Sequence, residues 1–330
     1  MNHQTMATAL LLKTSLFRTL SFTSKPFSLY PLPLKSHSFH LKAAMAEGSE
    51  IIEKEEAGVV GEEKKKVFVA GATGNTGKRI VQQLLAKGFA VKAGVRDVDK
   101  AKTSFSEGNP DLQFVSVKGQ DWNLGEEDYS NHHKILVCFG DACVQVKADV
   151  TEGSTKLAEA IGGDTDAVIC ATGFRRSLNL LTPWKVDNFG TVNLVEACRN
   201  LGVKRFVHVS SILVNGAAMG QLLNPAYIFL NVFGLVLVAK LQAENHIRKS
   251  GINYTIVRPG GLKNDPPNGN IVMEPEDTLY DGSISRDQVA EVAVEALVHP
   301  EADYKVVEIV ARADAPKKTF PELFGSVKQR

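Results

Sequence analysis

The sequence predicts an α/β fold built on a doubly wound parallel sheet, and three observations support this prediction. A short apolar run, Val67–Ala70, has the character of a buried parallel strand. A segment with helical periodicity, Asn75–Lys87, follows it after a turn rich in glycine. Strand-like and helix-like segments then alternate as far as Val310. In one sheet this alternation implies right-handed crossovers and a ligand cleft at the carboxyl ends of the strands.

The turn between the first strand and the first helix contains Gly71, Gly74 and Gly77. A tight strand-to-helix turn needs residues without a Cβ atom, and a pyrophosphate approaches the backbone only where no side chain blocks it. The helix N-terminus adds N–H groups and the positive end of a dipole. A flexible glycine loop is the alternative, but it does not explain why the helical pattern begins so abruptly. The spacing therefore favours a dinucleotide-binding turn.

Residues 1–46 are expected to form a chloroplast transit peptide that precedes the fold. They contain no Asp or Glu, five Lys or Arg and eleven Ser or Thr, and their apolar runs are too short for a secretory core or a membrane span. A merely disordered tail is the alternative. Residues 47–66 follow as a charged linker without aromatic residues, which lacks the apolar area to fold. The folded domain is thus expected at residues 67–330.

Charge argues against a nucleic-acid partner. Cleavage near Ala43–Ala46 would remove five of the 38 basic residues and none of the 37 acidic ones, so the net charge would change from +1 to −4. A chain with this charge lacks the electrostatic attraction on which nucleic-acid binding depends.

A second strand, Phe89–Val95, ends in Arg96 and Asp97, about twenty residues beyond the glycine turn. At this place an acidic residue would bind the ribose 2′-hydroxyl of NAD, whereas an arginine can accept the 2′-phosphate of NADP. Arg96 comes first after the strand, so we favour NADP(H) over NAD(H). A surface arginine at a strand end is the alternative.

Two segments, Leu112–Lys118 and Val144–Val150, compete for the third strand. We favour the second, because Asp149 at its end can contact the edge of an adenine. The residues between them, about 116–145, are polar and irregular apart from Ile135–Phe139. We expect them to form an insertion that loops out from the fold or is poorly ordered.

The rest of the chain continues the alternation. We expect buried, reduced thiols at Cys170 and Cys198, and a core histidine with satisfied hydrogen bonds at His208. The expected helices and strands are Ser154–Ile161, Ala167–Gly173, Val186–Leu201, Arg205–Ser211, Ile252–Gly261, Arg286–Val298 and Tyr304–Val310.

The stretch from Phe206 to Ala239 contains no Lys, Arg, Asp or Glu. Its most apolar part, Ile228–Ala239, is shorter than the roughly 20 residues of a transmembrane helix. We expect a buried helix or a subunit interface there. Peripheral contact with a membrane or lipid body, through residues 222–239, is the second interpretation.

Several motifs together make the chain resemble the atypical short-chain dehydrogenases/reductases. They are Gly71–Gly77, Ser210-Ser211, Lys240–Glu244 and Tyr254–Gly261, with further support from Thr182–Gly190 and Gly282–Ala290. Within that family the chain is similar to the plant plastid group related to the NAD(P)-binding domain of the inner-envelope import translocon's redox subunit. The resemblance covers about residues 66–327.

The resemblance implies a single Rossmann-like domain with a small substrate-side region toward the C-terminus. It also implies that NADP(H) is bound along the carboxyl ends of the strands. The implied cofactor-binding residues are Gly71, Thr73, Gly74, Asn75, Thr76, Gly77, Arg96, Asp149, Val150, Ala171, Thr172, Gly173, Lys240, Pro259, Gly260 and Gly261. Ser210 and Lys240 are the candidate catalytic residues, and no metal is implied.

The chain departs from the family pattern at the residue that would transfer a proton. Catalytic members place a Tyr four residues before the Lys, so that the ammonium group lowers the pKa of the phenol. Here Val236 stands four residues before Lys240, and Tyr227 stands thirteen residues before it. The usual proton relay is therefore in doubt. The insertion near residues 116–145 is the other departure, and we assign no function to it.

Two functions follow from these observations. The first is an NADPH-dependent reductase of a small lipophilic carbonyl or quinone-type compound in the plastid, since hydride transfer needs only the cofactor, a closed pocket and orientation. The second is a non-catalytic NADP(H)-binding sensor or docking protein with a protein or lipid partner, which the missing Tyr and the uncharged stretch favour. A nucleotide-sugar epimerase or dehydratase is weaker, because that chemistry depends on the absent Tyr.

Overall fold

A computed structural model of the chain describes residues 64–96, 98–105, 109–116, 136–139, 142–145, 153–173, 180–232 and 234–329. The expected transit peptide and residues 47–63 of the expected linker lie outside this part of the chain. So do three residues that the sequence analysis singled out, Asp97, Asp149 and Val150.

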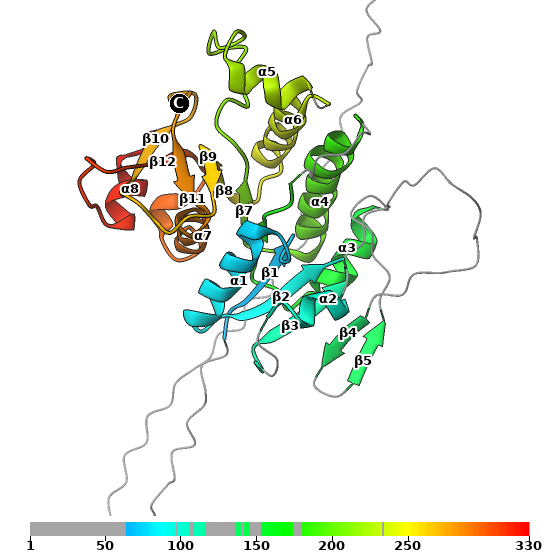
Figure 1. The fold of residues 1–330 in the computed structure, drawn as a ribbon. Helices are drawn as coiled ribbons and strands as arrows, with labels where there is room; N and C mark the ends of the chain where they lie inside the picture. Colours follow the sequence, from blue (N-terminus) through cyan, green and yellow to red (C-terminus); the bar gives the residue numbers. More distant parts are fainter. Residues whose placement is uncertain are drawn as a thin grey trace, which may run out of the picture. The chain divides into compact units, whose positions relative to one another are not determined.

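One large sheet forms the centre of the described domain (Figure 1). Its strands are β1 (Lys66–Ala70), β2 (Ala90–Val95), β3 (Leu112–Ser116), β4 (Leu136–Phe139), β5 (Ala142–Gln145), β6 (Ala167–Cys170), β7 (Arg205–Val209), β8 (Asn253–Pro259), β10 (Asn270–Pro275) and β12 (Lys305–Arg312). A separate two-stranded sheet pairs β9 (Gly261–Lys263) with β11 (Ser283–Ser285).

The order of the strands confirms the doubly wound prediction. Across the sheet they run β10-β12-β8-β7-β6-β1-β2-β3-β4-β5. From β12 to β3 all neighbours are parallel, while β10 and the pair β4–β5 are antiparallel additions at the two edges. The chain moves from β1 outward to β3, returns to β6, and then moves outward in the other direction. The order therefore reverses between β1 and β6, which is where such folds bind their ligands.

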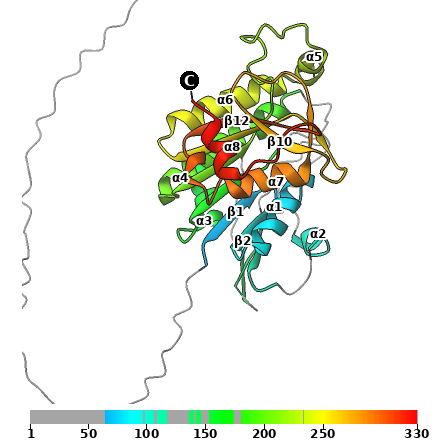
Figure 2. The same cartoon turned by 90° about the vertical axis from the view of Figure 1, so that its left-hand side faces the viewer.

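Helices cover both faces of this sheet, as Figures 1 and 2 show. They are α1 (Asn75–Ala86), α2 (Val98–Lys102), α3 (Ser154–Ile161), the π-helical segment η1 (Trp184–Gly190), α4 (Thr191–Leu201), α5 (Pro225–Val232), α6 (Val236–Lys249), α7 (Arg286–Glu295), the 3₁₀ turn η2 (Pro300–Ala302) and α8 (Phe320–Ser326). The helices expected near residues 75–87, 154–161, 186–201 and 286–298 are thus present, and the third begins with the π-helical segment.

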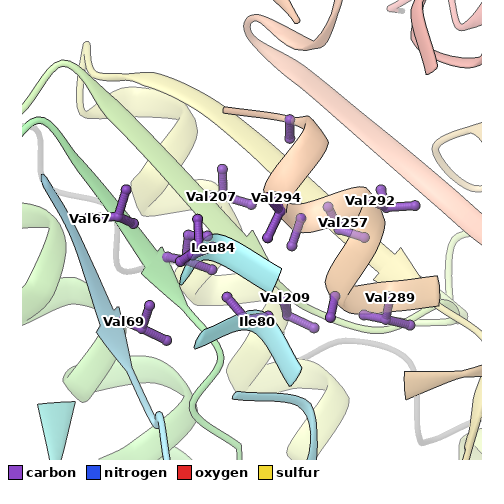
Figure 3. Close-up of a cluster of buried hydrophobic side chains, with 14 of the residues drawn as sticks. Val67, Val69, Ile80, Leu84, Val207, Val209, Val257, Val289, Val292 and Val294 are labelled. Carbon is purple, nitrogen blue, oxygen red and sulfur yellow. The ribbon is translucent and has the colours of Figure 1, made fainter. Parts of the chain in front are cut away.

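On one face, α1 and α7 lie side by side over the middle of the sheet (Figure 3). Ile80 and Leu84 of α1 are fully buried against valines of β1, β7 and β8, and the apolar face of α7 continues the same layer. On the other face of the sheet, α3, α4 and α6 cover the alternate residues of the strands, such as Phe68 of β1 and Phe206 of β7. Because consecutive residues of a strand point to opposite faces, strands buried on both faces are apolar throughout, which is why they could be recognised in the sequence.

A third, smaller cluster lies beyond the carboxyl ends of the strands. It contains Ile212, Leu213 and Val214, which follow β7, together with Leu237 at the start of α6 and Leu279. This cluster is separate from the two layers that cover the sheet, and it lies in the part of the chain for which the resemblance implies a substrate-side region.

The preference for residues 144–150 as the third strand was wrong. Leu112–Ser116 is the strand that pairs with β2 in parallel. The described residues of the expected insertion include β4 and β5, which form an antiparallel hairpin that joins the outer edge of β3 at Val115 and Val137. The edge of β3 offers N–H and C=O groups that need partners, and a nearby apolar segment of strand character supplies them.

Residues 228–239 were expected to form a buried helix or a subunit interface, and within this chain the first half is not buried. No residue of α5 is buried, and Ile228, Phe229 and Val232 are about half exposed or more. Only the start of α6, at Val236 and Leu237, lies in the core. Within the described residues no single helix is long and apolar enough to cross a bilayer; α5 and α6 together pass that test by length and composition, with a bend of 87° between them.

Candidate functional site

The glycine turn between β1 and α1 is packed so closely that two of its glycines, Gly71 and Gly77, have no room for a side chain. Gly71 has a φ of +79°, and a Cβ atom on it would lie 2.8 Å from the carbonyl oxygen of Ala171. A Cβ atom on Gly77 would lie 2.1 Å from the carbonyl oxygen of Gly71, and one on Gly74 would lie 3.1 Å from the same oxygen. The N–H of Gly74 donates to that oxygen at 2.9 Å and closes the turn.

The N-terminus of α1 has polar groups to offer to an anion. The first bond along the helix runs from the N–H of Lys78 to the carbonyl of Gly74. Within the described residues, the N–H groups of Asn75, Thr76 and Gly77 make no hydrogen bond. No side chain caps this helix and its first turn holds no acidic residue. Such an end can bind phosphate through its N–H groups and its dipole.

The segment after β6 borders this turn. The N–H of Ala171 donates to the carbonyl of Ala70 at 3.0 Å, and Ala171 is the residue that a side chain on Gly71 would strike. Thr172 is half buried, with its hydroxyl 3.2 Å from the sulfur of Cys170, and Gly173 is exposed. The structure thus brings the predicted segments 71–77 and 171–173 together.

Arg96 lies on the other side of the turn, directly after β2, which is the neighbour of β1. It is exposed, and within the described residues its guanidinium has no hydrogen bond or ion pair. This side chain is therefore available for an anionic ligand at the end of β2.

The predicted segment Pro259–Gly261 lies at the end of β8. A Cβ atom on Gly260 would lie 2.7 Å from the carbonyl oxygen of Gly282, so packing against the segment before β11 explains this glycine. The N–H of Gly261 donates to the same carbonyl at 2.9 Å. The segment is thus fixed to β11 and through it to the start of α7.

Lys240 is the buried cation of the site. It lies on α6, its side chain is 11% exposed, and its Nζ is 2.8 Å from Oδ1 of Asp187, whose side chain is fully buried. Asp187 belongs to the π-helical segment η1, a kind of helical irregularity that is common at functional sites. Burial lowers the pKa of Lys240, but the charge and hydrogen bond of Asp187 outweigh burial and raise the pKa above its usual value. Lys240 is therefore an ammonium group.

Ser210, the other candidate catalytic residue, donates a hydrogen bond to a buried carboxylate. Its hydroxyl donates to Oε1 of Glu244 at 2.5 Å. Glu244 lies one turn after Lys240 on α6 and accepts from Arg258 as well, with Nη2 to Oε2 at 2.7 Å. Arg258, 1% exposed, also binds Asp277 at 2.8 Å. Because the only hydrogen of the Ser210 hydroxyl is held by Glu244, its oxygen can act only as an acceptor toward a ligand.

Arg258 is the centre of a larger ionic network. Its Nη1 is 3.2 Å from Oε1 of Glu308, which faces it on β12. Glu308 is fully buried and also accepts from the N–H groups of residues 277, 278 and 279. Burial raises the pKa of Glu308, against the effect of these donors and of Arg258. The network therefore fixes β8, β12, α6 and the segment before β11 to one another.

The expectation of a satisfied core histidine at His208 was wrong in one respect. His208 is buried, but neither of its ring nitrogens has a hydrogen-bond partner within the described residues. Burial, with a smaller contribution from the charge of Lys240, lowers its pKa to about 3. His208 is thus a neutral imidazole. Its buried nitrogens, which have no partner among the described residues, lower the free energy of unfolding.

Val236 and Tyr227 confirm the departure that the sequence indicated. Val236 is the first residue of α6, buried one turn before Lys240, where the family places its Tyr. Tyr227 lies on α5, packs against the third cluster, and has its ring over Gly216. Cys170 and Cys198 are free and buried, as expected. No group of three or more His, Cys, Asp or Glu suited to a metal occurs among the described residues.

Comparison with known proteins assigns the family. Residues 71–124 and 131–300 match the family of NAD(P)H-binding domains. The chain belongs to this NAD(P)H-binding family. The matched range includes the glycine turn, Ser210, Lys240 and the Pro259–Gly261 segment.

Curated relatives extend this assignment. A chloroplastic protein of Arabidopsis thaliana is 68% identical over 264 residues, which are 80% of this chain and 83% of that protein. The chloroplastic protein TIC 62 of Pisum sativum is 35% identical over 76% of this chain and 43% of its own length. Sanguinarine reductase of Eschscholzia californica is 32% identical over 44% of this chain and 53% of its own length. The chain spans less than half of the TIC 62 proteins that it matches.

Solved structures support the fold alone, because their sequences have diverged far. A putative NAD-dependent epimerase/dehydratase of Bacillus halodurans is 22% identical with a TM-score of 0.58, covering 79% of this chain and 99% of its own. A short-chain dehydrogenase/reductase of Veillonella parvula, in complex with NADP, is 16% identical with a TM-score of 0.53, covering 77% and 98%.

The residues of the turn fit the cofactor of this family. The close packing of the Gly71–Gly77 turn brings the chain directly from β1 into α1 and leaves three N–H groups without partners at the start of the helix, which is the chemistry that a pyrophosphate requires. Bound there, NAD(P)H would supply the chain with a hydride donor.

Sequence analysis missed the carboxylates of the site. Asp187 stands in the motif Thr182–Gly190 and Glu244 ends the motif Lys240–Glu244, so both were in view but without a role. One signal was present: Glu244 follows Lys240 by four residues, which places both on one face of α6. Arg258 and Glu308 gave no local signal, because they meet only through the pairing of β8 with β12.

Proposed function

We propose that this chain binds NADP(H) at the glycine turn and uses it to reduce a small lipophilic carbonyl or quinone-type compound. The observation that carries the proposal is the combination of the closely packed glycine turn, the three N–H groups of α1 and the largely buried ammonium of Lys240. The first two bind a pyrophosphate. Lys240, held by Asp187, is a donor for the hydroxyls of the nicotinamide ribose.

Preference for NADP(H) over NAD(H) is supported by Arg96. The residue directly after β2 faces the 2′ position of the adenosine ribose in folds of this kind, and a guanidinium there binds a phosphate but gains nothing from a hydroxyl. The NADP complex of the Veillonella parvula relative shows that this fold accommodates the phosphorylated cofactor.

A lipophilic substrate is supported by the composition of the substrate-side region. Ile212, Leu213 and Val214 follow Ser210 directly, and no charged side chain occurs between residues 206 and 239. A substrate bound beside this uncharged region would gain little from a charged group and much from an apolar one.

The proton that balances the reduction comes from water or from the substrate's own acidic group. Hydride transfer to a carbonyl carbon leaves an oxyanion, which must take up one proton. Ser210 is not positioned to provide it, because its hydroxyl hydrogen is directed to Oε1 of Glu244, and Val236 has no proton to give. Ser210 instead acts as an acceptor that orients the ligand.

A non-catalytic NADP(H) sensor or docking protein is the second candidate. Two observations favour it. The side chains of Ser210 and Lys240 are each paired with a buried carboxylate, and Val236 occupies the position at which a Tyr would be expected. The two candidates share cofactor binding and differ in turnover.

The plastid is the proposed compartment. Residues 1–46 have the composition of a transit peptide, and the relatives from Arabidopsis thaliana and Pisum sativum are chloroplastic.

Contact with a neutral lipid surface through α5 and the segment before it belongs to the same proposal. Leu223 is 88% exposed and Val232 65%, next to exposed Leu222, Ile228 and Phe229. The absence of Lys and Arg here disfavours anionic headgroups. Flotation with neutral galactolipid vesicles tests this contact. Leu223→Asp combined with Val232→Asp should abolish flotation, and unchanged flotation of that variant would contradict the proposed contact.

The experiment that tests the function is a titration of the protein from residue 47 onward with NADPH and with NADH, followed by a screen for NADPH oxidation with plastid quinones and aldehydes. Saturable binding with turnover supports the reductase. Saturable binding without turnover on any compound supports the sensor. Absence of binding by either cofactor contradicts both.

A further inference from the structure

The first turn of α1 carries an unusual distribution of charge. Lys78 and Arg79 stand in that turn, which holds no acidic residue. Cations are unfavourable at a helix N-terminus, because they face the positive end of the helix dipole. A bound anion removes this conflict.

Arg79 is already compensated within the chain. Its Nε lies 2.8 Å from Oδ1 of Asp287, the second residue of α7, and its Nη1 donates to the carbonyl of Asn75 at 2.7 Å. The same helices are joined again by Gln83, which donates to the carbonyl of Asp287 at 3.0 Å. Asp287 thus fixes the start of α7 beside the first turn of α1.

Arg286, the residue before it, is not compensated. Its Nη1 donates to Oδ1 of Asn264 at 2.8 Å and to the carbonyl of Leu262 at 3.3 Å, both neutral acceptors. Within the described residues no carboxylate pairs with it. Partial burial and the nearby charge of Arg79 both lower the pKa of Arg286, so its surroundings disfavour its charge, although an arginine stays protonated.

The position of Arg286 separates it from Arg96. Through Leu262 and Asn264, Arg286 is joined to the segment that follows β8, and through its neighbour Asp287 to the first turn of α1. In the sheet, β8 and β2 lie on opposite sides of β1. For a dinucleotide bound at the glycine turn, Arg96 at the end of β2 therefore lies on the adenosine side. Arg286 lies beside the pyrophosphate, on the nicotinamide side.

We propose that Arg286 is a cofactor-binding residue that contacts the pyrophosphate, and that it binds NADPH and NADH alike while Arg96 discriminates between them. This inference rests on the proposed position of the cofactor at the glycine turn. Binding would supply the anion that the N-terminus of α1 and Arg286 lack, and would tie the Pro259–Lys263 segment to the cofactor.

The test is a titration of the full processed chain and its Arg286→Gln variant with NADPH and NADH at two salt concentrations. Loss of a charge-assisted contact should raise both dissociation constants by the same factor, about tenfold or more. The salt dependence should become weaker, because one fewer cation faces the phosphates. Arg286→Lys should keep most of the salt dependence. Arg199→Gln, which removes a guanidinium bonded to Glu196 on the opposite helical layer, is the matched control and should change neither constant.

Each outcome decides between the inference and the function on which it rests. Unchanged affinity of the folded Arg286→Gln variant for both cofactors would overturn the inference and leave the proposed function intact. Weakening of NADPH alone would overturn it too, since it would assign Arg286 to the 2′-phosphate. A wild-type chain that binds neither cofactor would overturn both. Thermal unfolding of each variant establishes that it is folded.

Discussion

The two sides of the candidate site use their polar groups in opposite ways. At the glycine turn, three backbone N–H groups and the guanidinium of Arg96 have no partner within the described residues. At the carboxyl end of β7, Ser210 and Lys240 are each held by a buried carboxylate. The first side is organised to receive a ligand. On the second side, the polar groups interact mainly with one another, through hydrogen bonds and ion pairs that stabilise the fold.

This contrast separates the proposal of cofactor binding, which both candidate functions share, from the proposal of catalysis. Unpaired donors at a helix N-terminus cost little while they face water, and they gain when an anion arrives. A hydroxyl committed to a carboxylate cannot also protonate a substrate. Ser210 and Lys240 thus lie close to carboxylates, with Val236 at the position where the resemblance implies a Tyr.

The largest effect is expected from the glycine turn itself. Gly74→Val would place a branched side chain against the Gly71 carbonyl and over the surface that the pyrophosphate needs. We expect binding of NADPH and NADH to weaken by more than about a hundredfold, with the thermal unfolding temperature little changed. Gly163→Val is the control, because a Cβ atom there meets nothing within 4 Å. Full retention of binding by Gly74→Val would remove the turn from the site.

The second side is expected to respond in stability rather than in cofactor affinity. Arg258→Met leaves Glu244 and Glu308 buried without their cation, so the free energy of unfolding should fall by about 3–5 kcal/mol. Urea denaturation measures this change. Arg199→Met, which breaks an exposed pair, should cost less than about 1 kcal/mol. A small effect of Arg258→Met would mean that the network is not essential to the fold.

Discrimination between the cofactors gives an effect of intermediate size. Arg96→Asp should weaken NADPH binding by about ten- to a hundredfold, because a charge-assisted phosphate contact is replaced by repulsion. NADH binding should change far less. Competitive titration of both cofactors measures the ratio, and equal losses would rule out the 2′-phosphate contact.

The smallest effect concerns pH and His208. Its folded pKa of about 3 lies below its unfolded value of about 6.5, so between these values the unfolded chain binds the extra proton. Stability contributed by the neutral imidazole is thus complete above about pH 6.5 and is lost as the pH falls toward 3, by about 1.4 kcal/mol per unit. His208→Leu should show a correspondingly flatter dependence in urea denaturation between pH 6.5 and 5. Identical slopes would show that His208 does not carry this linkage.

Sequence reasoning succeeded where the signal was local. The first strand, the turn and the first helix follow one another in the chain. The apolar run of β1, the glycines of the turn and the helical periodicity of α1 were therefore sufficient to predict their structure. It failed where a choice depended on distant partners. Either of two segments could be the third strand, and only the edge of β2 decides for Leu112–Ser116. Composition suggested a buried helix or a subunit interface at α5. Whether another part of the chain covers an apolar segment depends on the tertiary fold, and the sequence of the segment alone does not determine it.

The site divides in the same way. The turn and Arg96 could be named from spacing alone, whereas the carboxylates that hold Lys240 and Ser210 could not. Asp187 is 53 residues from Lys240, and Glu308 is 50 residues from Arg258. Such pairs arise from strand order and helix packing, which no short motif encodes.

The most direct measurement is a crystal structure of the processed protein with NADPH. The account predicts pyrophosphate oxygens within hydrogen-bonding distance of the N–H groups of Asn75, Thr76 and Gly77, and the Ser210–Glu244 bond unchanged. A nucleotide bound elsewhere, or a Ser210 hydroxyl turned from Glu244 toward the nicotinamide or substrate, would contradict it.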